Sequence, residues 1–242
     1  MGGKLRLDNL ILKRGLAESR AKAQALIMAG EVTVGGRVAS KAGTPVDEAA
    51  EITVAQPPPF VSRGGLKLDH ALSEFGLDVT GKVAADIGAS TGGFTDCLLQ
   101  RGARRVYAVD VGYGQLDYRL RQDGRVVVLE RVNARHQFSL PERVALVTMD
   151  VSFISVEKVI PSVVGLLKED GRLLVLLKPQ FEARRDEVGK GGVIRTLEVQ
   201  ARVVGRFLVW AAAHRLRLGG LIASPITGAS GNREFLLLLK PV

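Results

Sequence analysis

The sequence predicts an α/β fold in which a mostly parallel sheet of seven strands, ending in an antiparallel hairpin, follows a small α+β domain. From residue 83 onward apolar strand segments alternate with helical segments, which is typical of a Rossmann-like sheet covered on both faces. The last two strand segments, 218–224 and 234–239, are joined too closely for a parallel crossover. A run of prolines separates this part of the chain from the small domain that precedes it.

Residues 1–56 are expected to form the small domain. Helices with apolar periodicity are predicted over 5–13 and 19–29, and Gly15 and Gly30 end them. Short alternating segments that are typical of strands lie at 31–34, 37–38 and 52–54.

The segment from Gln56 to Phe60 contains three consecutive prolines. Such a run favours an extended, semi-rigid spacer that has no N–H groups to give to a sheet. We therefore assign 57–61 to a linker and 62–242 to the second domain.

The second domain is expected to begin with an amphipathic helix over 66–75, which Gly76 ends. The remaining segments are assigned by their periodicity and their boundaries. Strands are predicted at 83–86, 105–110, 126–130, 144–150, 173–178, 218–224 and 234–239, and helices at 93–101, 156–167 and 196–216.

Residues 83–95 carry the clearest chemical pattern, an apolar strand that runs through Asp86 into a glycine-rich turn and a helix. Glycines let the backbone lie against a ligand, and the helix start offers free N–H groups. Asp110 ends the next strand, where a carboxylate can take both hydroxyls of a ribose. The spacing is not that of a dinucleotide loop, and Asp86 would repel a pyrophosphate but suits a cationic methionine group. The pattern favours S-adenosylmethionine as cofactor.

Four charged residues lie where ligands bind in such sheets, at or near the carboxyl ends of the strands. Asp150 and Lys178 each end a strand, and Glu234 opens the last one. Lys67 lies on the helix before the first strand, at a distance that spacing does not define. A single charged residue at a strand end usually only meets water. Together with the glycine-rich turn, however, the four indicate a catalytic site.

The composition indicates a polyanionic partner. The net charge is +9 with a pI near 10.0, and up to residue 41 eight lysines and arginines stand against three acids. Charge alone also suits a membrane surface, but no leader or spanning segment is visible, so we expect a cytoplasmic protein without a membrane partner. With one cysteine and three histidines, we expect neither a disulfide nor a metal site.

The first 41 residues resemble the S4 RNA-binding domain in the runs 6–8, 15–20 and 30–36. The runs 60–68, 86–98, 109–116, 150–155, 177–182 and 188–193 then make nearly the whole chain similar to the TlyA family. That family joins an S4 domain to an FtsJ-like methyltransferase domain and methylates ribose 2′-hydroxyls of ribosomal RNA with S-adenosylmethionine. The resemblance implies a cytidine of large-subunit 23S rRNA as first substrate and leaves small-subunit 16S rRNA open.

The resemblance also implies roles for individual residues. The catalytic tetrad falls on Lys67, Asp150, Lys178 and Glu234, with Lys178 as base and with Glu234 and Lys67 orienting the ribose. The expected cofactor residues are Asp86, Gly88, Ser90, Thr91, Gly92, Gly93, Phe94, Asp110, Asn133 and Asp150. The expected RNA-binding residues are Lys4, Arg6, Arg14, Arg20, Lys22, Lys41 and Arg63. Apart from the resemblance, Phe181 and 189–192 lie in a long glycine-rich connection, which is typical either of a substrate lid or of a mobile surface loop without function.

Three alternatives stay open. An RNA base methyltransferase could share the cofactor loop, although 150–153 lacks the two prolines usual for amine methylation. A membrane-active protein is a second alternative, because members of this family are often labelled haemolysins. A non-catalytic RNA-binding assembly factor is the third. The oligomeric state is not predicted beyond a preference for a monomer.

Overall fold

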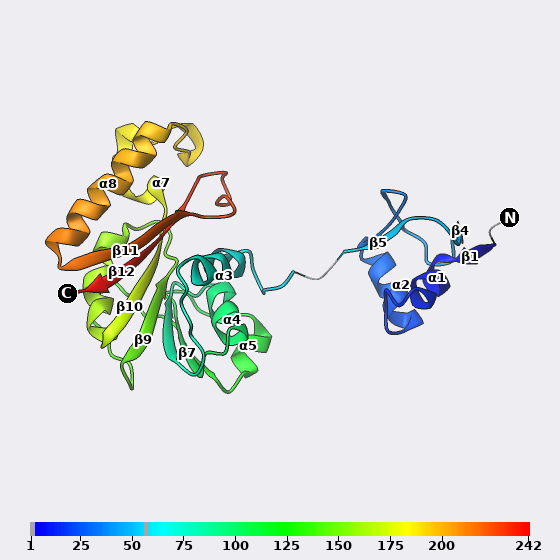
Figure 1. Cartoon of the computed structure of the whole chain (residues 1–242), viewed down its shortest axis with the longest axis horizontal. Helices are drawn as coiled ribbons and strands as arrows, with labels where there is room; N and C mark the ends of the chain where they lie inside the picture. The colour runs from blue at the N-terminus through cyan, green and yellow to red at the C-terminus, as the bar shows by residue number, and fades with distance from the viewer. Residues whose placement is uncertain (1–2, 56–57) are drawn as a thin grey trace. The chain divides into compact units, whose positions relative to one another are not determined.

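A computed structural model describes residues 3–55 and 58–242 of the chain (Figure 1). The contacts between residues divide the chain into two compact units, Met1–Pro58 and Pro59–Val242. Gln56 and Pro57 of the predicted linker lie outside the described residues.

The first unit is a small α+β domain with two helices against short antiparallel strands. Its elements are β1 (Lys4–Arg6), α1 (Leu7–Lys13), α2 (Arg20–Met28), β2 (Val32–Val34), β3 (Arg37–Val38), β4 (Pro45–Asp47) and β5 (Ile52–Val54). β1 pairs with β4, and β2 lies between β3 and β5. The two helices and β2 share one core, in which Leu7, Ile11 and Val32 are fully buried.

Local capping explains where α2 begins and ends. The Ser19 hydroxyl accepts a hydrogen bond from the Lys22 N–H at 3.1 Å, and Gly30 takes a left-handed φ of +75° just beyond the helix. The pair β1 and β4 was not predicted, because three-residue strands carry almost no alternation in sequence.

The second unit alternates strands and helices through most of its length. Its strands are β6 (Val83–Ile87), β7 (Arg105–Val109), β8 (Val126–Leu129), β9 (Val144–Met149), β10 (Leu167–Leu177), β11 (Leu216–Ala223) and β12 (Phe235–Pro241). Its α-helices are α3 (Gly64–Glu74), α4 (Gly93–Gln100), α5 (Tyr118–Gln122), α6 (Ile160–Val163), α7 (Pro179–Glu182) and α8 (Leu197–Ala213). Short 3-10 turns, η1 (Val156–Lys158), η2 (Val164–Leu166), η3 (Arg185–Glu187) and η4 (Lys190–Gly192), complete it.

The seven strands form one sheet in the order β11-β12-β10-β9-β6-β7-β8. Strands β8, β7, β6, β9 and β10 run parallel, whereas β12 is antiparallel to both of its neighbours, β10 and β11. The fold class predicted from the sequence, a mostly parallel seven-stranded sheet with a terminal antiparallel hairpin, is confirmed.

Successive strand residues alternate between two cores, one on each face of the sheet. Ala84 belongs to the core shared with α3, α4 and α5, while the next residue, Ala85, belongs to the core shared with α6 and α8. Figure 1 shows these helices on the two sides of the sheet. Strands β6 to β9 and the second half of β10 are therefore mostly apolar on both faces, which is why the sequence showed continuous runs rather than alternation.

Part of the predicted linker packs into the second unit. Phe60 is buried there, and a Cβ placed on Gly65 would lie 2.2 Å from its ring. The Val61 N–H donates to the Asp96 carboxylate at 2.8 Å. The assignment of 57–61 to a spacer is corrected at this end, because an aromatic side chain that fills a glycine-lined space anchors the segment.

The predicted helix over 156–167 is replaced by three short turns, η1, α6 and η2. Pro161 lies in the first turn of α6, where its missing N–H costs no hydrogen bond but where it stops the preceding turn from continuing. Strand β10 begins at Leu167, six residues earlier than predicted, with an irregularity in its pairing before Arg172. Among the described residues no helix is long and apolar enough to cross a membrane.

Candidate active site

Two adjoining cavities lie at the carboxyl edge of the sheet. The first, of about 580 Å³, lies between the glycine-rich turn, α3 and the residues around β12, and the second, of about 390 Å³, lies beside the ends of β7 and β9. Gly88, Ser90, Asp150, Ser152 and Phe153 line both cavities. A ligand held in one cavity therefore reaches the mouth of the other.

Two glycines of the glycine-rich turn have close neighbours, a backbone carbonyl in one case and a leucine side chain in the other. Gly88 has a φ of +82°, and a Cβ on it would lie 2.6 Å from the Asp150 carbonyl oxygen. Gly92 has a φ of +97°, and its Cβ would lie 2.3 Å from Leu120. Both positions exclude a side chain, which is the physical reason for glycine here.

Asp110, which follows the neighbouring strand β7, binds the backbone of the glycine-rich turn. Its carboxylate accepts hydrogen bonds from the Ser90 N–H at 2.8 Å and the Gly112 N–H at 2.7 Å. It lines the second cavity together with Asn133, between apolar walls that include Val111 and Val132. A carboxylate and an amide in an apolar slot fit the ribose and the base of a nucleoside such as S-adenosylmethionine.

Asp86 does not reach either cavity. Its side chain is fully buried and accepts hydrogen bonds from the Thr95 hydroxyl at 2.8 Å and the Thr148 hydroxyl at 3.3 Å. Burial, reinforced by the Asp150 carboxylate, raises the pKa of Asp86 to about 7 despite these bonds. Asp86 was expected to contact the methionine group directly. In the structure it lies behind the glycine-rich turn and lines neither cavity. Gly92 likewise lines neither cavity.

The four predicted catalytic residues all line the first cavity. Lys67 Nζ lies 2.5 Å from Glu234 Oε2, and Lys178 Nζ lies 2.6 Å from Asp150 Oδ1. The second contact is an ion pair without hydrogen-bond geometry, because Asp150 Oδ1 accepts no hydrogen bond from a described group. Each lysine is paired with a carboxylate. Lys67 and Lys178 thus belong to two separate ion pairs in the same cavity.

Ser152 completes the surroundings of Lys178. Lys178 Nζ donates to the Ser152 hydroxyl oxygen at 2.6 Å, so that two oxygens from the segment after β9 hold the amine. Both lysines are nearly buried, with 10% of each side chain exposed. Sequence reasoning missed Ser152, although its place two residues after Asp150 was the available signal.

An exposed aromatic ring stands at the mouth of the two cavities. Phe153 is 91% exposed and has a φ of +64°, which is rare for a bulky residue. Its ring centroid lies 5.2 Å from that of Phe181, whose ring lies 5.9 Å from Lys178 Nζ. Glu182 supports this arrangement, because its carboxylate accepts from the Ser155 hydroxyl at 2.6 Å and the Val156 N–H at 2.8 Å.

Hydrogen bonds and an ion pair connect the segment predicted as a lid to neighbouring residues. Gly191 and Gly192 line the first cavity, and the buried Asn232 donates to the Gly192 carbonyl and accepts from the Ile194 N–H, both at 2.9 Å. Upstream, the Glu187 carboxylate pairs with Arg206 of α8 at 2.7 Å, and hydrogen bonding by Arg206 lowers the pKa of Glu187 to about 2. Asn232 was not among the predicted site residues.

The predicted RNA-binding residues of the first unit are all exposed, but two of their guanidinium groups are held by one carboxylate. Arg6 and Arg20 both contact Asp8 at 3.0 Å. Arg14 instead donates to the backbone carbonyls of Glu48 and Ala50, which gives it a structural role within the domain. Arg63 belongs to the second unit and lines the first cavity. Within 3–55 and 58–242 no cluster of three potential metal ligands is found.

Comparison with known proteins decides the family. The model of the FtsJ-like methyltransferase family matches residues 60–241, and that of the S4 domain matches residues 5–52. The chain is also 45% identical to the 16S/23S rRNA (cytidine-2′-O)-methyltransferase TlyA of Mycobacterium tuberculosis, over 99% of this chain and 91% of that protein.

The chain belongs to the TlyA family.

Other members of the TlyA family agree with this assignment. Hemolysin A of Brachyspira hyodysenteriae is 43% identical over 96% of this chain and 98% of that protein. A solved structure of a Streptococcus thermophilus protein superposes with a TM-score of 0.74 at 40% identity, covering all of this chain and 90% of that one. The chain is therefore an S-adenosylmethionine-dependent RNA methyltransferase of the TlyA family.

Proposed function

We propose that this chain transfers a methyl group from S-adenosylmethionine to the ribose 2′-hydroxyl of a cytidine in ribosomal RNA, with 23S rRNA of the large subunit as first substrate and 16S rRNA as second. The observation that carries the proposal is the pair of buried ion contacts, Lys67 with Glu234 and Lys178 with Asp150, in one cavity beside the glycine-rich turn. The activity named for the Mycobacterium tuberculosis relative supports the same acceptor.

Cofactor binding is assigned to the second cavity and the shared residues. Asp110 would take the ribose, Asn133 the base, and Gly88 and Ser90 the region between the cavities. Asp150 lines both cavities and would adjoin the bound group while it is paired with Lys178. When bound, S-adenosylmethionine supplies an electrophilic methyl group on a cationic sulfur.

Lys178 is the proposed base. A ribose hydroxyl is a weak nucleophile, so its proton must leave as the oxygen attacks in line. Lys178 must be a neutral amine to take that proton, and it then returns to the ammonium form that is paired with the Asp150 carboxylate. Ser152 and Asp150 fix the position of Nζ, while Lys67 and Glu234 orient the ribose. Holding oxygen and methyl group in line contributes most of the rate.

Methyl transfer to purified ribosomal subunits tests the proposal. Radiolabelled S-adenosylmethionine is supplied with large or small subunits, and 2′-O-methyl sites are mapped. Label on a cytidine ribose supports the proposal, and label on a base overturns it. Lys178→Ala should abolish transfer and retain cofactor binding, whereas the exposed Lys168→Ala, near the opposite end of β10, should behave as wild type. A ribosomal substrate would place this activity in the cytoplasm.

A further inference from the structure

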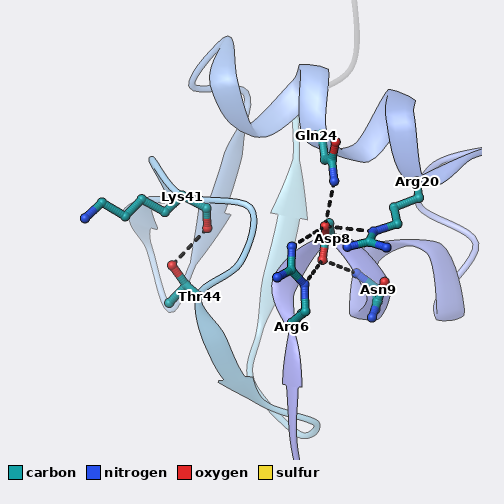
Figure 2. A network of polar contacts seen from close by, with 7 residues as sticks. All are labelled: Arg6, Asp8, Asn9, Arg20, Gln24, Lys41 and Thr44. Atoms are coloured by element: carbon teal, nitrogen blue, oxygen red, sulfur yellow. Dashed lines mark hydrogen bonds and ion pairs between the residues drawn. The ribbon is translucent and has the colours of Figure 1, made fainter.

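A buried carboxylate organises the basic surface of the first unit (Figure 2). Asp8 is fully buried at the start of α1, yet it is ionised at neutral pH because hydrogen bonding by Arg6 holds its pKa well below the usual range. Its two oxygens accept from Arg6 Nε at 3.1 Å, Arg6 Nη2 at 3.0 Å, Arg20 Nε at 3.0 Å, Gln24 Nε2 at 2.9 Å and the Asn9 N–H at 3.0 Å.

These bonds fix two arginines that would otherwise be mobile. Arg6 comes from β1 and Arg20 from the first turn of α2, and both planar guanidinium groups converge on Asp8 in Figure 2. A long cationic side chain normally loses much rotamer freedom when it binds a ligand. Here that freedom is already restricted before any ligand arrives.

The same two arginines keep donors free for a ligand. Their side chains are 48% and 51% exposed. Arg6 Nη1 and both terminal nitrogens of Arg20 donate to none of the residues that the structure describes. The pair therefore presents several fixed N–H groups, the donor pattern that suits phosphate oxygens.

A neighbouring loop packs against the Arg6 guanidinium group. The Leu7 N–H donates to the Thr44 carbonyl at 2.9 Å, and the Asp8 N–H donates to the Ala42 carbonyl at 3.0 Å. A Cβ on Gly43 would lie 3.2 Å from Arg6 Nη1, so the loop packs against that guanidinium. Lys41 precedes this loop, and in Figure 2 its side chain extends away from Asp8.

We propose that Asp8 is a positioning residue for RNA binding, which holds Arg6 and Arg20 in one arrangement so that their free N–H groups take phosphate oxygens of the RNA. The inference rests on the proposed function, because it takes ribosomal RNA as the ligand. The inference predicts a change in RNA affinity opposite in direction to the change expected from charge alone. Removing an acid from a basic surface should strengthen RNA binding by charge alone, whereas loss of a positioning residue should weaken it.

The test compares Asp8→Asn with Glu48→Gln in the full-length chain. Glu48 lies in the same domain, and within the described part of the chain its side chain pairs only with the exposed Lys13, so Glu48→Gln removes one negative charge without touching Arg6 or Arg20. Affinity for large ribosomal subunits and for polyuridine RNA is measured over a range of salt concentrations. We expect Asp8→Asn to bind subunits about tenfold more weakly and with a shallower salt dependence. Glu48→Gln should bind as tightly as wild type or more tightly.

A folded Asp8→Asn variant that binds subunits as tightly as wild type overturns the proposal. Because loss of a buried carboxylate can also destabilise the domain, Arg6→Lys and Arg20→Lys provide a second test that keeps Asp8 and the net charge. If fixed guanidinium groups matter, each lysine variant loses several-fold in affinity. If only charge matters, both bind as wild type, and the proposal fails.

Methyl transfer by the same preparations separates this inference from the proposed function. A wild-type chain that binds subunits but transfers no methyl group overturns the proposed function, and the affinities of the variants still decide the role of Asp8. A wild-type chain with no affinity for either RNA overturns both.

Discussion

Lys67 Nζ lies 2.5 Å from Glu234 Oε2, although 167 positions separate the two residues in the chain. Only 10% of the lysine side chain and 3% of the glutamate side chain are exposed. The pair joins α3 to the residue before β12 across the mouth of the first cavity. It therefore contributes to folding as well as to the arrangement of the site.

Replacing either partner of this ion pair alone should destabilise the fold. Lys67→Met or Glu234→Gln leaves its partner charged and buried, so we expect each to lower the free energy of unfolding by roughly 3 kcal/mol. The double variant should recover part of that loss but should remain inactive in methyl transfer. Urea unfolding of the three variants measures the effect. Strictly additive losses in the double variant would show that the two side chains do not interact.

Asp86 should make the stability of the ligand-free chain fall as pH rises. Its pKa is raised from 3.8 to about 7, so its protonated form is the one that the fold prefers. The stability that it contributes is complete below about pH 4 and is lost as pH approaches about 7. Between about pH 5 and pH 8, wild type should lose more unfolding free energy than Asp86→Asn. Parallel pH profiles for the two proteins would contradict this.

Gly88→Ala should disrupt the cofactor loop. The new Cβ would need a φ of +82° and would lie 2.6 Å from the Asp150 carbonyl oxygen. We expect a loss of roughly 1–3 kcal/mol in stability and at least about tenfold in affinity for S-adenosylmethionine, measured by calorimetry. Gly205→Ala in α8, where a Cβ meets nothing within 4 Å, is the control and should be neutral or stabilising.

Phe153→Ala should impair RNA binding without unfolding the protein. The ring is 91% exposed, so its removal exposes little new surface. Stacking of a base on such a ring is worth about 1–3 kcal/mol, which corresponds to a rise in KM for RNA of roughly 5- to 150-fold. Tyr118→Ala removes another exposed ring, on α5, away from both cavities. Equal steady-state kinetics for the two variants would exclude a stacking role.

The strands that are followed by a charged site residue were predictable from the sequence. Asp150 and Lys178 follow apolar segments in a parallel sheet, and parallel strands bring their carboxyl ends to one edge. The sequence therefore indicated a common site for these two residues. Lys67 was different, because its position depends on how α3 packs against α4, and no spacing rule describes that contact.

Other features depend on contacts that leave little trace in one sequence. Asp86 lies within β6, one residue before its end, and is turned away from the cavities toward Thr95 and Thr148, whereas Asp110 follows the end of β7. Asn232 occupies a loop, where asparagine is usually only a turn residue, but its amide holds Gly192 and Ile194. Only tertiary structure distinguishes such residues from ordinary turn or strand positions.

The position of β12 has a consequence for synthesis of the protein. This strand lies between β10 and β11, although both precede it in the chain. Until residues 235–241 have left the ribosome, β11 has no neighbour in the sheet, and Glu234 cannot meet Lys67. A nascent chain that ends before Glu234 carries three of the four proposed catalytic residues but no assembled site. Catalytic competence and closure of the sheet are thus reached in the same folding step.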